Sequence, residues 1–301
     1  MSHKNKKNIN KEICENLGQK CAFGRSKHED KKVGKTAEKI YSHSTMKAYM
    51  DECQKFGKYC KEEFGCKNLE ECRSHIGDYL METAGEKSSW SVHKSAAALG
   101  KLYLMSTVEM QKEFNFKLPE RRRADISRSR NTVENDKHFN QEKHKDFVSF
   151  CRGCGLRRNE LINLKPEQII EKPDGSVFIK IGKGDGAKGN RPRLLEVLPS
   201  ARETVLKARN FAQVIGSNRV FEKVPTHADI HSYRADYCTE LYREKYVERY
   251  GSLDVKPEKE DRYFCRKDKA GVCYSREIMH EVSKNMGHNR IDIIAENYLK
   301  L

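Results

Sequence analysis

The chain has 301 residues, which favours two domains over one because single domains commonly hold about 150 residues. Its 59 lysine and arginine residues outnumber 44 acidic residues, and the formal net charge of +15 favours a polyanionic partner, with nucleic acid ahead of an anionic membrane surface. No apolar run approaches the roughly 18 residues that cross a bilayer, and the first residues lack the apolar core of a signal peptide. We therefore expect a protein of the cytoplasm with no membrane partner.

The first 36 residues are polar and basic, with ten Lys or Arg residues against four acidic ones. This composition predicts that residues 1–36 form a flexible arm, which is either solvated or ordered by a partner. Three amphipathic helical patterns follow, over residues 44–64, 68–80 and 88–104. Together they predict a small all-α domain over residues 37–116.

A basic segment comes next. Residues 117–134 contain Pro119 and a run of arginines, which favours a linker between two domains. Beyond it, helical patterns over residues 140–155 and 157–164 lead to two alternating apolar runs around a Gly-rich turn, which is typical of a β-hairpin. The rest of the chain is again mainly helical in pattern.

The cysteines indicate reduced thiols. Eleven is an odd number, and they are scattered through the chain, which argues against a disulfide framework. Cys151 and Cys154 form a CxxC pair, and Cys265 and Cys273 a more widely spaced one. Neither pair has the further Cys or His ligands that a tetrahedral zinc site needs nearby, so we expect no metal site.

Two short motifs bracket the start of the predicted hairpin region. "CGLRRNELINL" places Arg157 and Glu160 three residues apart, on one face of a helix opening. "IGKGDG" places Lys183 at the hairpin tip. A lone arginine or lysine is most often a surface charge, so each motif is weak by itself.

Two further motifs follow in the last third of the chain. His231 and Arg234 lie three residues apart in "HSYRADYC" and so project from one helical face. "MGHNRIDIIAENY" holds His288 and Tyr298. A single histidine or tyrosine in such a setting is usually a packing residue, and it is the order of all four motifs that carries information.

In this order the motifs resemble the catalytic domain of the tyrosine recombinases, the phage-type integrase family. The family's boxes read GLRxxEL, a GKG-like turn, HxxR, and GH before a tyrosine. The resemblance covers residues 135–301 and implies a mainly α, α+β catalytic domain with a small antiparallel sheet. The all-α domain over 37–116 is similar to the family's SAM-like core-binding domain in length, position and helical character. The catalytic residues implied are Arg157, Lys183, His231, Arg234, His288 and Tyr298, with Glu160 in support.

The sequence departs from the family pattern at two places. Tyr298 lies ten residues after His288, one more than the commoner family spacing. Residues 250–276 form an unusually long stretch between the HxxR and GH boxes, which has the pattern of a second hairpin or an insertion and to which we assign no chemical role. Arg158 adjoins Arg157, and the GLR match favours Arg157 as the catalytic residue.

The chemistry that the resemblance implies is cleavage and rejoining of duplex DNA through a 3′-phosphotyrosine. Two guanidinium groups suit the charge that builds on phosphate oxygens. A tyrosine hydroxyl has a pKa of about 10 in water, so it needs a base to remove its proton near pH ~7. His231 could be that base. Lys183 would protonate the leaving 5′ oxygen, and His288 would hydrogen-bond the phosphate. The covalent link retains the bond energy, so neither ATP nor a metal cofactor is required.

The resemblance also implies partners. These are double-stranded DNA, further protomers in a homo-oligomer on DNA from dimer to tetrameric synapse, and an accessory DNA-bending protein. It places the protein at the nucleoid of a bacterial cytoplasm. Further DNA contacts are expected from basic residues of the linker and hairpin: Arg121, Arg122, Arg123, Arg128, Arg130, Lys188 and Arg191.

Three functions remain open at this point. A recombinase would integrate or excise a mobile element or resolve dimeric replicons, and the basic N-terminal segment only weakly favours the mobile element. A type IB topoisomerase shares the chemistry but rejoins the same strand as a monomer. A regulator would bind DNA on the same scaffold without cleaving it, which the six intact residues argue against.

Overall fold

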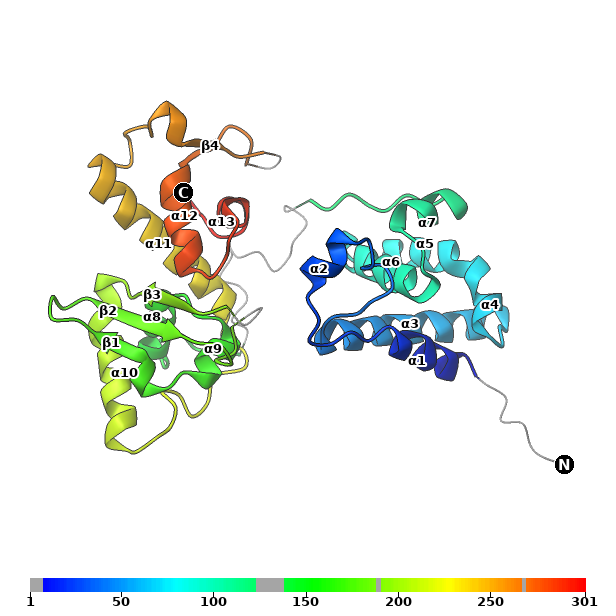
Figure 1. Cartoon of the computed structure of the whole chain (residues 1–301), viewed down its shortest axis with the longest axis horizontal. Coiled ribbons are helices and arrows are strands. Elements are labelled where there is room, and N and C mark those ends of the chain that lie inside the picture. The colour runs from blue at the N-terminus through cyan, green and yellow to red at the C-terminus, as the bar shows by residue number, and fades with distance from the viewer. Residues whose placement is uncertain (1–7, 123–137, 188–190, 267–268) are drawn as a thin grey trace. The chain divides into compact units, whose positions relative to one another are not determined.

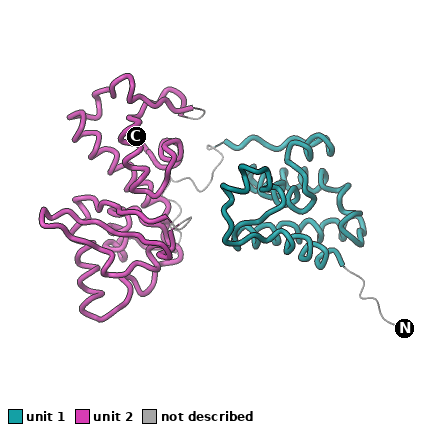
Figure 2. The backbone as a smooth tube through the Cα atoms, viewed as in Figure 1, with its two compact units in different colours: residues 1–125 teal, residues 126–301 magenta. Residues whose placement is uncertain are grey.

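The computed structural model describes residues 8–122, 138–187, 191–266 and 269–301 (Figure 1). The chain divides into two compact units, residues 1–125 and 126–301, which we call unit 1 and unit 2 (Figure 2). The division falls within residues 117–134, the segment that the sequence predicts to be a linker. Of that segment, residues 123–134 lie outside the described residues.

Unit 1 is all-α over its described residues, as the sequence predicts. Side chains from α1, α3, α5 and α6 meet in one core, in which Ile13, Phe56, Leu80 and Leu99 are fully buried. The predicted second helix is divided into α4, a 3-10 turn and α5. The elements are α1 Ile9–Gln19, α2 Lys27–Lys32, α3 His43–Phe64, α4 Leu69–Cys72, a 3-10 turn Arg73–His75, α5 Ile76–Glu86, α6 Ser89–Tyr103 and α7 Thr107–Glu113.

The prediction of a flexible arm over residues 1–36 is wrong for residues 8–36. Asn8 caps α1 by accepting a hydrogen bond from the Lys11 amide, and α1 packs its apolar side into the core of unit 1. Gly57 of α3 allows this close approach, since a Cβ there would lie 2.7 Å from Cγ2 of Ile9. The prediction considered only the overall charge of residues 1–36 and overlooked three apolar residues on one face of this helix: Ile9, Ile13 and Leu17.

Unit 2 is mixed, with helices around two small antiparallel sheets. The first sheet has the order β1-β2-β3, and Ile179 pairs with Leu195 in the predicted hairpin. Strand β1 is an addition that the sequence pattern did not predict. The strands are β1 Ile169–Glu171, β2 Val177–Ile181, β3 Arg193–Glu196, β4 Arg262–Phe264 and β5 Cys273–Ser275. The helices are α8 Lys145–Cys154, α9 Arg158–Asn163, α10 Arg202–Val214, α11 Ile230–Tyr250, α12 Arg276–Asn285 and α13 Ile291–Asn297, with 3-10 turns at Pro166–Gln168, Pro199–Ala201 and Lys259–Asp261.

Helix α11 connects the two hydrophobic cores of unit 2. Ile230 and Tyr233, in its first turn, belong to the core that α8 and the three-stranded sheet share. From Ala235 onward its buried side chains belong to a second core, which α12 and α13 complete (Figure 1). The HxxR motif therefore lies on α11 where the two cores meet.

The segment 250–276 contains the second hairpin, as predicted, because β4 and β5 pair antiparallel. Three tyrosines of α11 hold it. The Tyr246 hydroxyl donates to the Val255 carbonyl at 2.5 Å, and the Tyr250 hydroxyl donates to Asp261 Oδ2 at 2.8 Å. The Tyr242 hydroxyl accepts a hydrogen bond from the backbone amide of Ser275, the last residue of β5.

None of the helices in the described ranges combines the length and the apolar character needed to cross a lipid bilayer.

Candidate active site

A tight turn between α8 and α9 presents the first candidate residue. Helix α8 ends at Cys154. The next residue, Gly155, has a φ of 55°, and a Cβ there would lie 2.2 Å from Cδ1 of Tyr237 on α11. Only glycine combines this left-handed backbone with so close a contact. The chain turns at Gly155, and Arg157 is the residue immediately before α9.

Glu160 fixes Arg157 at two points. One carboxylate oxygen accepts a hydrogen bond from the Arg157 backbone amide at 2.7 Å, and the other accepts one from Arg157 Nη1 at 2.9 Å. Burial of Glu160 opposes ionisation, but the hydrogen bonds and charge of Arg193, with those of Arg157, lower the pKa of Glu160 to about 2. The carboxylate is therefore charged and acts as a rigid anchor.

Arg193, on β3, is a site residue that the sequence analysis missed. Its Nη1 and Nη2 donate to the two oxygens of Glu160 at 2.8 and 2.7 Å, and its Nε donates to the Asn285 carbonyl at 3.0 Å. Gly287 has a φ of 65° and leaves room for this side chain, since a Cβ there would lie 3.1 Å from Arg193. The alternation of side chains along a strand could have indicated it, because Arg193 lies on the same face as Leu195 and Val197, which are both fully buried.

His288 lies beside Arg157 in the loop after α12. Arg157 Nη2 donates to the Met286 carbonyl at 3.1 Å and lies 3.4 Å from His288 Nε2. The Ser283 hydroxyl donates to the His288 carbonyl at 2.9 Å and fixes the loop. The GLR and GH motifs, more than a hundred residues apart in sequence, therefore meet in space.

Arg234 is a fully buried guanidinium, with 0% of its surface exposed. Nη1 donates to the Gly155 carbonyl and Nη2 to the Met286 carbonyl. Its buried Nε–H has no hydrogen-bond partner, and no ion pair to Arg234 is found, among the residues that the structure describes. Burial, and then the charge of Arg157, lower the pKa of Arg234 below its ordinary value.

Tyr298 follows the last residue of α13 and is only 5% exposed. Its ring centroid lies 5.6 Å from Arg234 Cζ and 5.5 Å from the centroid of the His288 ring. Ile294 and Leu299 are buried beside it, as the apolar pattern of this segment predicts. Four of the six candidate residues are thus brought together: Arg157, Arg234, His288 and Tyr298.

His231 and Lys183 have different surroundings. His231 is exposed on the first turn of α11, one turn before the buried Arg234. Lys183 is exposed in the β2–β3 turn and lines a hollow of about 660 Å³ with Lys165 and Arg219. Within the described residues, no hydrogen bond or ion pair links Lys183 to the four side chains that meet.

Arg158 is directed away from this cluster. Its Nη1 donates to the Pro225 carbonyl and its Nη2 to the Ala228 carbonyl, both at 2.6 Å. It therefore holds the loop that leads into α11, and of the two adjacent arginines it is Arg157 that contacts His288.

The remaining expected DNA contacts lie on the surface or outside the described residues. The guanidinium of Arg121 lies 4.9 Å from the centroid of the Trp90 ring, and Arg122 Nε lies 3.2 Å from Glu120 Oε2. Arg191 is exposed just before β3. Arg123, Arg128, Arg130 and Lys188 lie outside the described residues.

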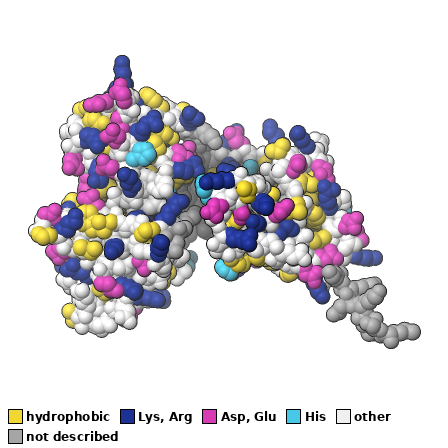
Figure 3. All heavy atoms as spheres, in the orientation of Figure 1, with side chains coloured by type: hydrophobic (Ala, Val, Ile, Leu, Met, Phe, Trp, Pro, Cys, Tyr) yellow, Lys and Arg dark blue, Asp and Glu magenta, His cyan; other side chains and the backbone are white. Residues whose placement is uncertain are grey.

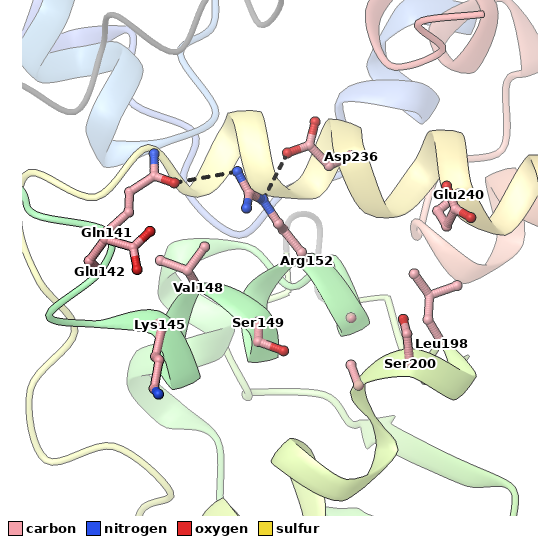
Figure 4. A pocket seen from close by; sticks show the side chains of 12 residues that line it. Gln141, Glu142, Lys145, Val148, Ser149, Arg152, Leu198, Ser200, Asp236 and Glu240 are labelled. Atoms are coloured by element: carbon pink, nitrogen blue, oxygen red, sulfur yellow. Dashed lines mark hydrogen bonds and ion pairs between the residues drawn. The ribbon is translucent and has the colours of Figure 1, made fainter.

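A second hollow of unit 2, of about 430 Å³, lies between α8, the 3-10 turn Pro199–Ala201 and α11 (Figure 4). Arg152 reaches across it, with Nε 3.2 Å from Asp236 Oδ2 and Nη2 3.4 Å from Gln141. The other oxygen of Asp236 pairs with Lys300 at 2.9 Å. None of the six candidates lines this hollow, and its central charges pair with one another or with the C-terminal segment.

Comparisons with known proteins identify the fold. No protein-family model matches this sequence, and no curated protein matches it. The solved structure of the XerH site-specific recombinase, bound to a palindromic difH substrate, aligns with a TM-score of 0.53 over 96% of this chain and 84% of XerH, at 15% identity. The chain therefore has a fold similar to that of the XerH recombinase. The Tn1549 transposon integrase in complex with circular intermediate DNA aligns over 96% of this chain and 95% of its own, at 13% identity and a TM-score of 0.47.

The predicted fold class is thereby confirmed. Both an all-α unit and a mainly α unit with a small antiparallel sheet are present, and the alignment with XerH spans nearly the whole of this chain. An identity of 15% supports a shared recombinase fold and leaves the roles of individual residues to their own geometry.

Proposed function

We propose that this protein is a site-specific tyrosine recombinase, which cleaves and rejoins duplex DNA through a covalent 3′-phosphotyrosine. The observation that carries the proposal is the buried guanidinium of Arg234, which lies against the ring of Tyr298. Its hydrogen-bond acceptors are neutral carbonyls, Gly155 and Met286.

A buried cation without an anion is costly, since burial removes the hydration of the charge. An incoming phosphate would supply the missing negative charge, and the Nε–H of Arg234, which has no other partner among the described residues, would donate to it. Because Arg234 is fully buried, the phosphate reaches this donor only after the side chains that cover it move. Arg157, held by Glu160, presents a second guanidinium close to His288. Two fixed forks of donors around one tyrosine suit a phosphodiester whose charge grows as it is attacked.

The reaction then follows from the residue types. The Tyr298 hydroxyl oxygen attacks phosphorus, His231 accepts its proton, and the 5′ oxygen leaves with a proton from Lys183. His288 donates a hydrogen bond to the phosphate. Attack by a 5′ hydroxyl on the phosphotyrosine reverses the step, and no energy source is consumed because one phosphoester replaces another.

The charge of the chain supports DNA as the substrate. Lys and Arg side chains are distributed among acidic and hydrophobic side chains over the visible face of each unit (Figure 3). The net charge of +15 predicts affinity for a polyanion that falls steeply as salt is added, because binding releases counterions. We propose duplex DNA as the partner, and protomers assembled on it as the active form.

The test is covalent trapping on DNA. The probe is a pool of nicked duplexes with randomised flanks, in which the short strand beyond the cleavage point diffuses away and leaves the protein attached. We expect a protein–DNA adduct on a denaturing gel, and sequencing of the attached DNA identifies the site. Tyr298→Phe should abolish the adduct and retain binding, because phosphate contacts come mainly from cations. Tyr263→Phe, in the β4–β5 hairpin, is the matched control and should form the adduct normally.

The outcomes separate the alternatives. An adduct formed by the Tyr298→Phe protein would remove Tyr298 as the nucleophile. Binding without any adduct from the unaltered protein would contradict the enzyme and favour a regulator. If the adduct forms, joining of strands from two different duplexes supports a recombinase, whereas relaxation of supercoiled DNA without such joining supports a type IB topoisomerase.

Lys183 is tested through the leaving group. Lys183→Ala should slow cleavage of an ordinary phosphodiester by roughly 100-fold or more, the usual contribution of a general acid. A 5′-bridging phosphorothiolate should be cleaved nearly normally, because a thiolate leaves without a proton. Equal losses on both substrates would remove Lys183 from this role and leave Lys188 as the next candidate.

A further inference from the structure

The β4–β5 hairpin contacts the segment that carries Tyr298. Lys269, in the turn of this hairpin, donates from Nζ to the Ala295 carbonyl at 2.9 Å and to the Leu299 carbonyl at 2.6 Å. These two acceptors lie on either side of Tyr298 in the sequence. One ammonium group therefore bridges the end of α13 and the residue that follows the tyrosine.

The bridge supplies what the end of a helix lacks. The last carbonyls of a helix have no intrahelical partner, and a cation is favourable there because it complements the helix dipole. Helix α13 has only seven residues, and isolated helices of that length are marginal in water. The tyrosine segment must therefore be held by contacts outside itself, and Lys269 provides two of them.

The lysine is held in turn by a fixed frame. The Cys265 amide donates to the Val272 carbonyl at 2.8 Å, and the Val272 amide donates to the Lys269 carbonyl at 3.1 Å, which closes the turn. Cys265 is buried in the same core as Tyr298. The tyrosines of α11 anchor the rest of the hairpin, so Lys269 acts from a base that is packed onto unit 2.

Two residues of α11 also hold the tail. The Thr239 hydroxyl lies 3.2 Å from both the Tyr298 carbonyl and the Lys300 amide, and Lys300 pairs with Asp236 at 2.9 Å. The latter pair is partly exposed, so it contributes little in water. These two residues join the tail to α11, whereas Lys269 joins it to the β4–β5 hairpin.

We propose that Lys269 is a positioning residue, which clamps the Tyr298 segment onto its own unit and thereby commits the tyrosine to the active site of the same chain. The consequence for cleavage rests on the proposed function, whereas the clamp itself does not. This gives residues 250–276 the role that the sequence alone did not assign.

The clamp is tested first without DNA, by hydrogen exchange on the full chain. Lys269→Met keeps the length of the side chain and removes its charge. We expect exchange of the Tyr298 and Leu299 amides to become roughly tenfold faster, since both depend on the end of α13 being held. Exchange in α11 and α12 should not change.

Control variants make this measurement decisive. Lys269→Arg should exchange as the unaltered protein does, because a guanidinium also donates to carbonyls. Lys256→Met removes a charge from an exposed position of the same segment and should leave the tail unchanged. If Lys269→Met exposes α12 as well, Lys269→Gln, which retains amide donors, replaces it. Unchanged exchange at Tyr298 in Lys269→Met would overturn the clamp.

Commitment to the same chain is tested by mixing two inactive proteins on the nicked duplex pool. Arg157→Ala supplies a tyrosine without a complete site, and Tyr298→Phe supplies a site without a tyrosine. With Lys269 intact we expect no adduct. Adding Lys269→Met to the Arg157→Ala chain should free its tyrosine and yield an adduct on that chain.

Two results of the mixture would overturn the commitment. One is an adduct on the Arg157→Ala chain while its Lys269 is intact. The other is no adduct after Lys269→Met, although hydrogen exchange shows the tail released. If the unaltered protein forms no adduct on any DNA, the proposed function fails, and the exchange measurement still decides whether Lys269 clamps the tail.

Discussion

Within the described residues, each unit buries one glutamate among cations, and the two glutamates are held in different ways. Glu52 of unit 1 is 4% exposed and Glu160 of unit 2 is 0% exposed. Burial opposes ionisation of both glutamates, yet the pKa of each is lowered to about 2. At Glu52 the hydrogen bonds that lower it come from Ser95 and two lysines, and at Glu160 they come from arginines. The same electrostatic result is therefore reached with two kinds of partner.

The partners differ in their access to water. Lys55 and Lys94, which bind Glu52, have side chains 57% and 49% exposed, and each can leave for solvent at little cost. Arg157 and Arg193, which bind Glu160, are 15% and 5% exposed. A planar guanidinium fixes the direction of its hydrogen bonds, whereas an ammonium is a rotating point charge.

The difference shows which of the two units fixes the position of a charged side chain. In unit 1 the lysines neutralise a buried carboxylate and stabilise the packing of α3 against α6. In unit 2 the carboxylate is the fixed part, and it determines where the Arg157 guanidinium points. Under the proposed function Arg157 meets a phosphate, and a residue that must do so within a fraction of an ångström needs such a rigid anchor.

The largest effect is expected from Glu160→Gln. It leaves Arg157 and Arg193 buried without a counter-charge, so the free energy of unfolding of unit 2 should fall by about 3–5 kcal/mol. Hydrogen exchange in α9 and β3 measures this for unit 2. The fluorescence of Trp90, the only tryptophan, reports on unit 1 and should show an unchanged transition.

The pH dependence of the same variant provides a control. A carboxylate whose pKa falls from 4.5 to about 2 on folding stabilises the protein fully above pH 4.5, and this contribution is lost as the pH falls from 4.5 towards 2. Unit 2 of Glu160→Gln should therefore lose less stability than the unaltered unit over that interval. An equally steep acid dependence in both proteins would contradict the assigned role of Glu160.

The second effect concerns activity. Arg193 acts on Arg157 through Glu160 and through the loop after α12, whose Asn285 carbonyl it binds. Arg193→Met should therefore slow adduct formation by roughly 100-fold through misplacement of Arg157. The binding of duplex DNA should change little. Arg191→Met, two residues earlier on the exposed side, is the matched control and should weaken binding without slowing the covalent step. A wholly unchanged rate for Arg193→Met would show that Arg157 is positioned without Arg193.

The sequence was most informative where chemistry forces particular residue types. Arg157, Arg234, His288 and Tyr298 are implied by the resemblance of four ordered motifs to the tyrosine recombinases, and they meet in the structure. The β2–β3 hairpin follows directly from alternation around a Gly-rich turn. Alternation is a local signal and the order of motifs can be read along the chain, so these features could be predicted without knowing which elements pack together.

Features set by packing between distant elements could not be predicted. The role of Arg193 depends on Glu160 and on Asn285, which the chain brings together only when α12 packs against β3. The clamp by Lys269 depends on the hairpin folding back over α13. The helix over 9–19 was missed for another reason: the charge count was taken over residues 1–36 as a whole, while the buried face of this helix holds only three residues.

A smaller effect is expected in unit 1. Glu52→Gln removes the charge that Lys55 and Lys94 bind, but both lysines can turn to solvent and the new amide can still accept from Ser95. We expect a loss of about 1.5 kcal/mol, within the range for a hydrogen bond to a charged group. Denaturant unfolding followed by Trp90 fluorescence measures it. A loss as large as that of Glu160→Gln would show that the lysines are as constrained as the arginines.

The smallest effect is expected from Lys55→Ala. Its Nζ lies 3.2 Å from Glu52 Oε1, but Lys94 binds the same oxygen at 2.9 Å and Ser95 binds the other at 2.6 Å, so the carboxylate keeps two partners. Because most of the lysine is in water, its loss should change the free energy of unfolding by less than about 0.5 kcal/mol. The same Trp90 unfolding curve, repeated at high salt, should show an even smaller difference, since salt screens exposed charges. A cost above about 1 kcal/mol, or one that does not respond to salt, would mean that Glu52 is anchored as rigidly as Glu160, and the contrast between the two units would no longer hold.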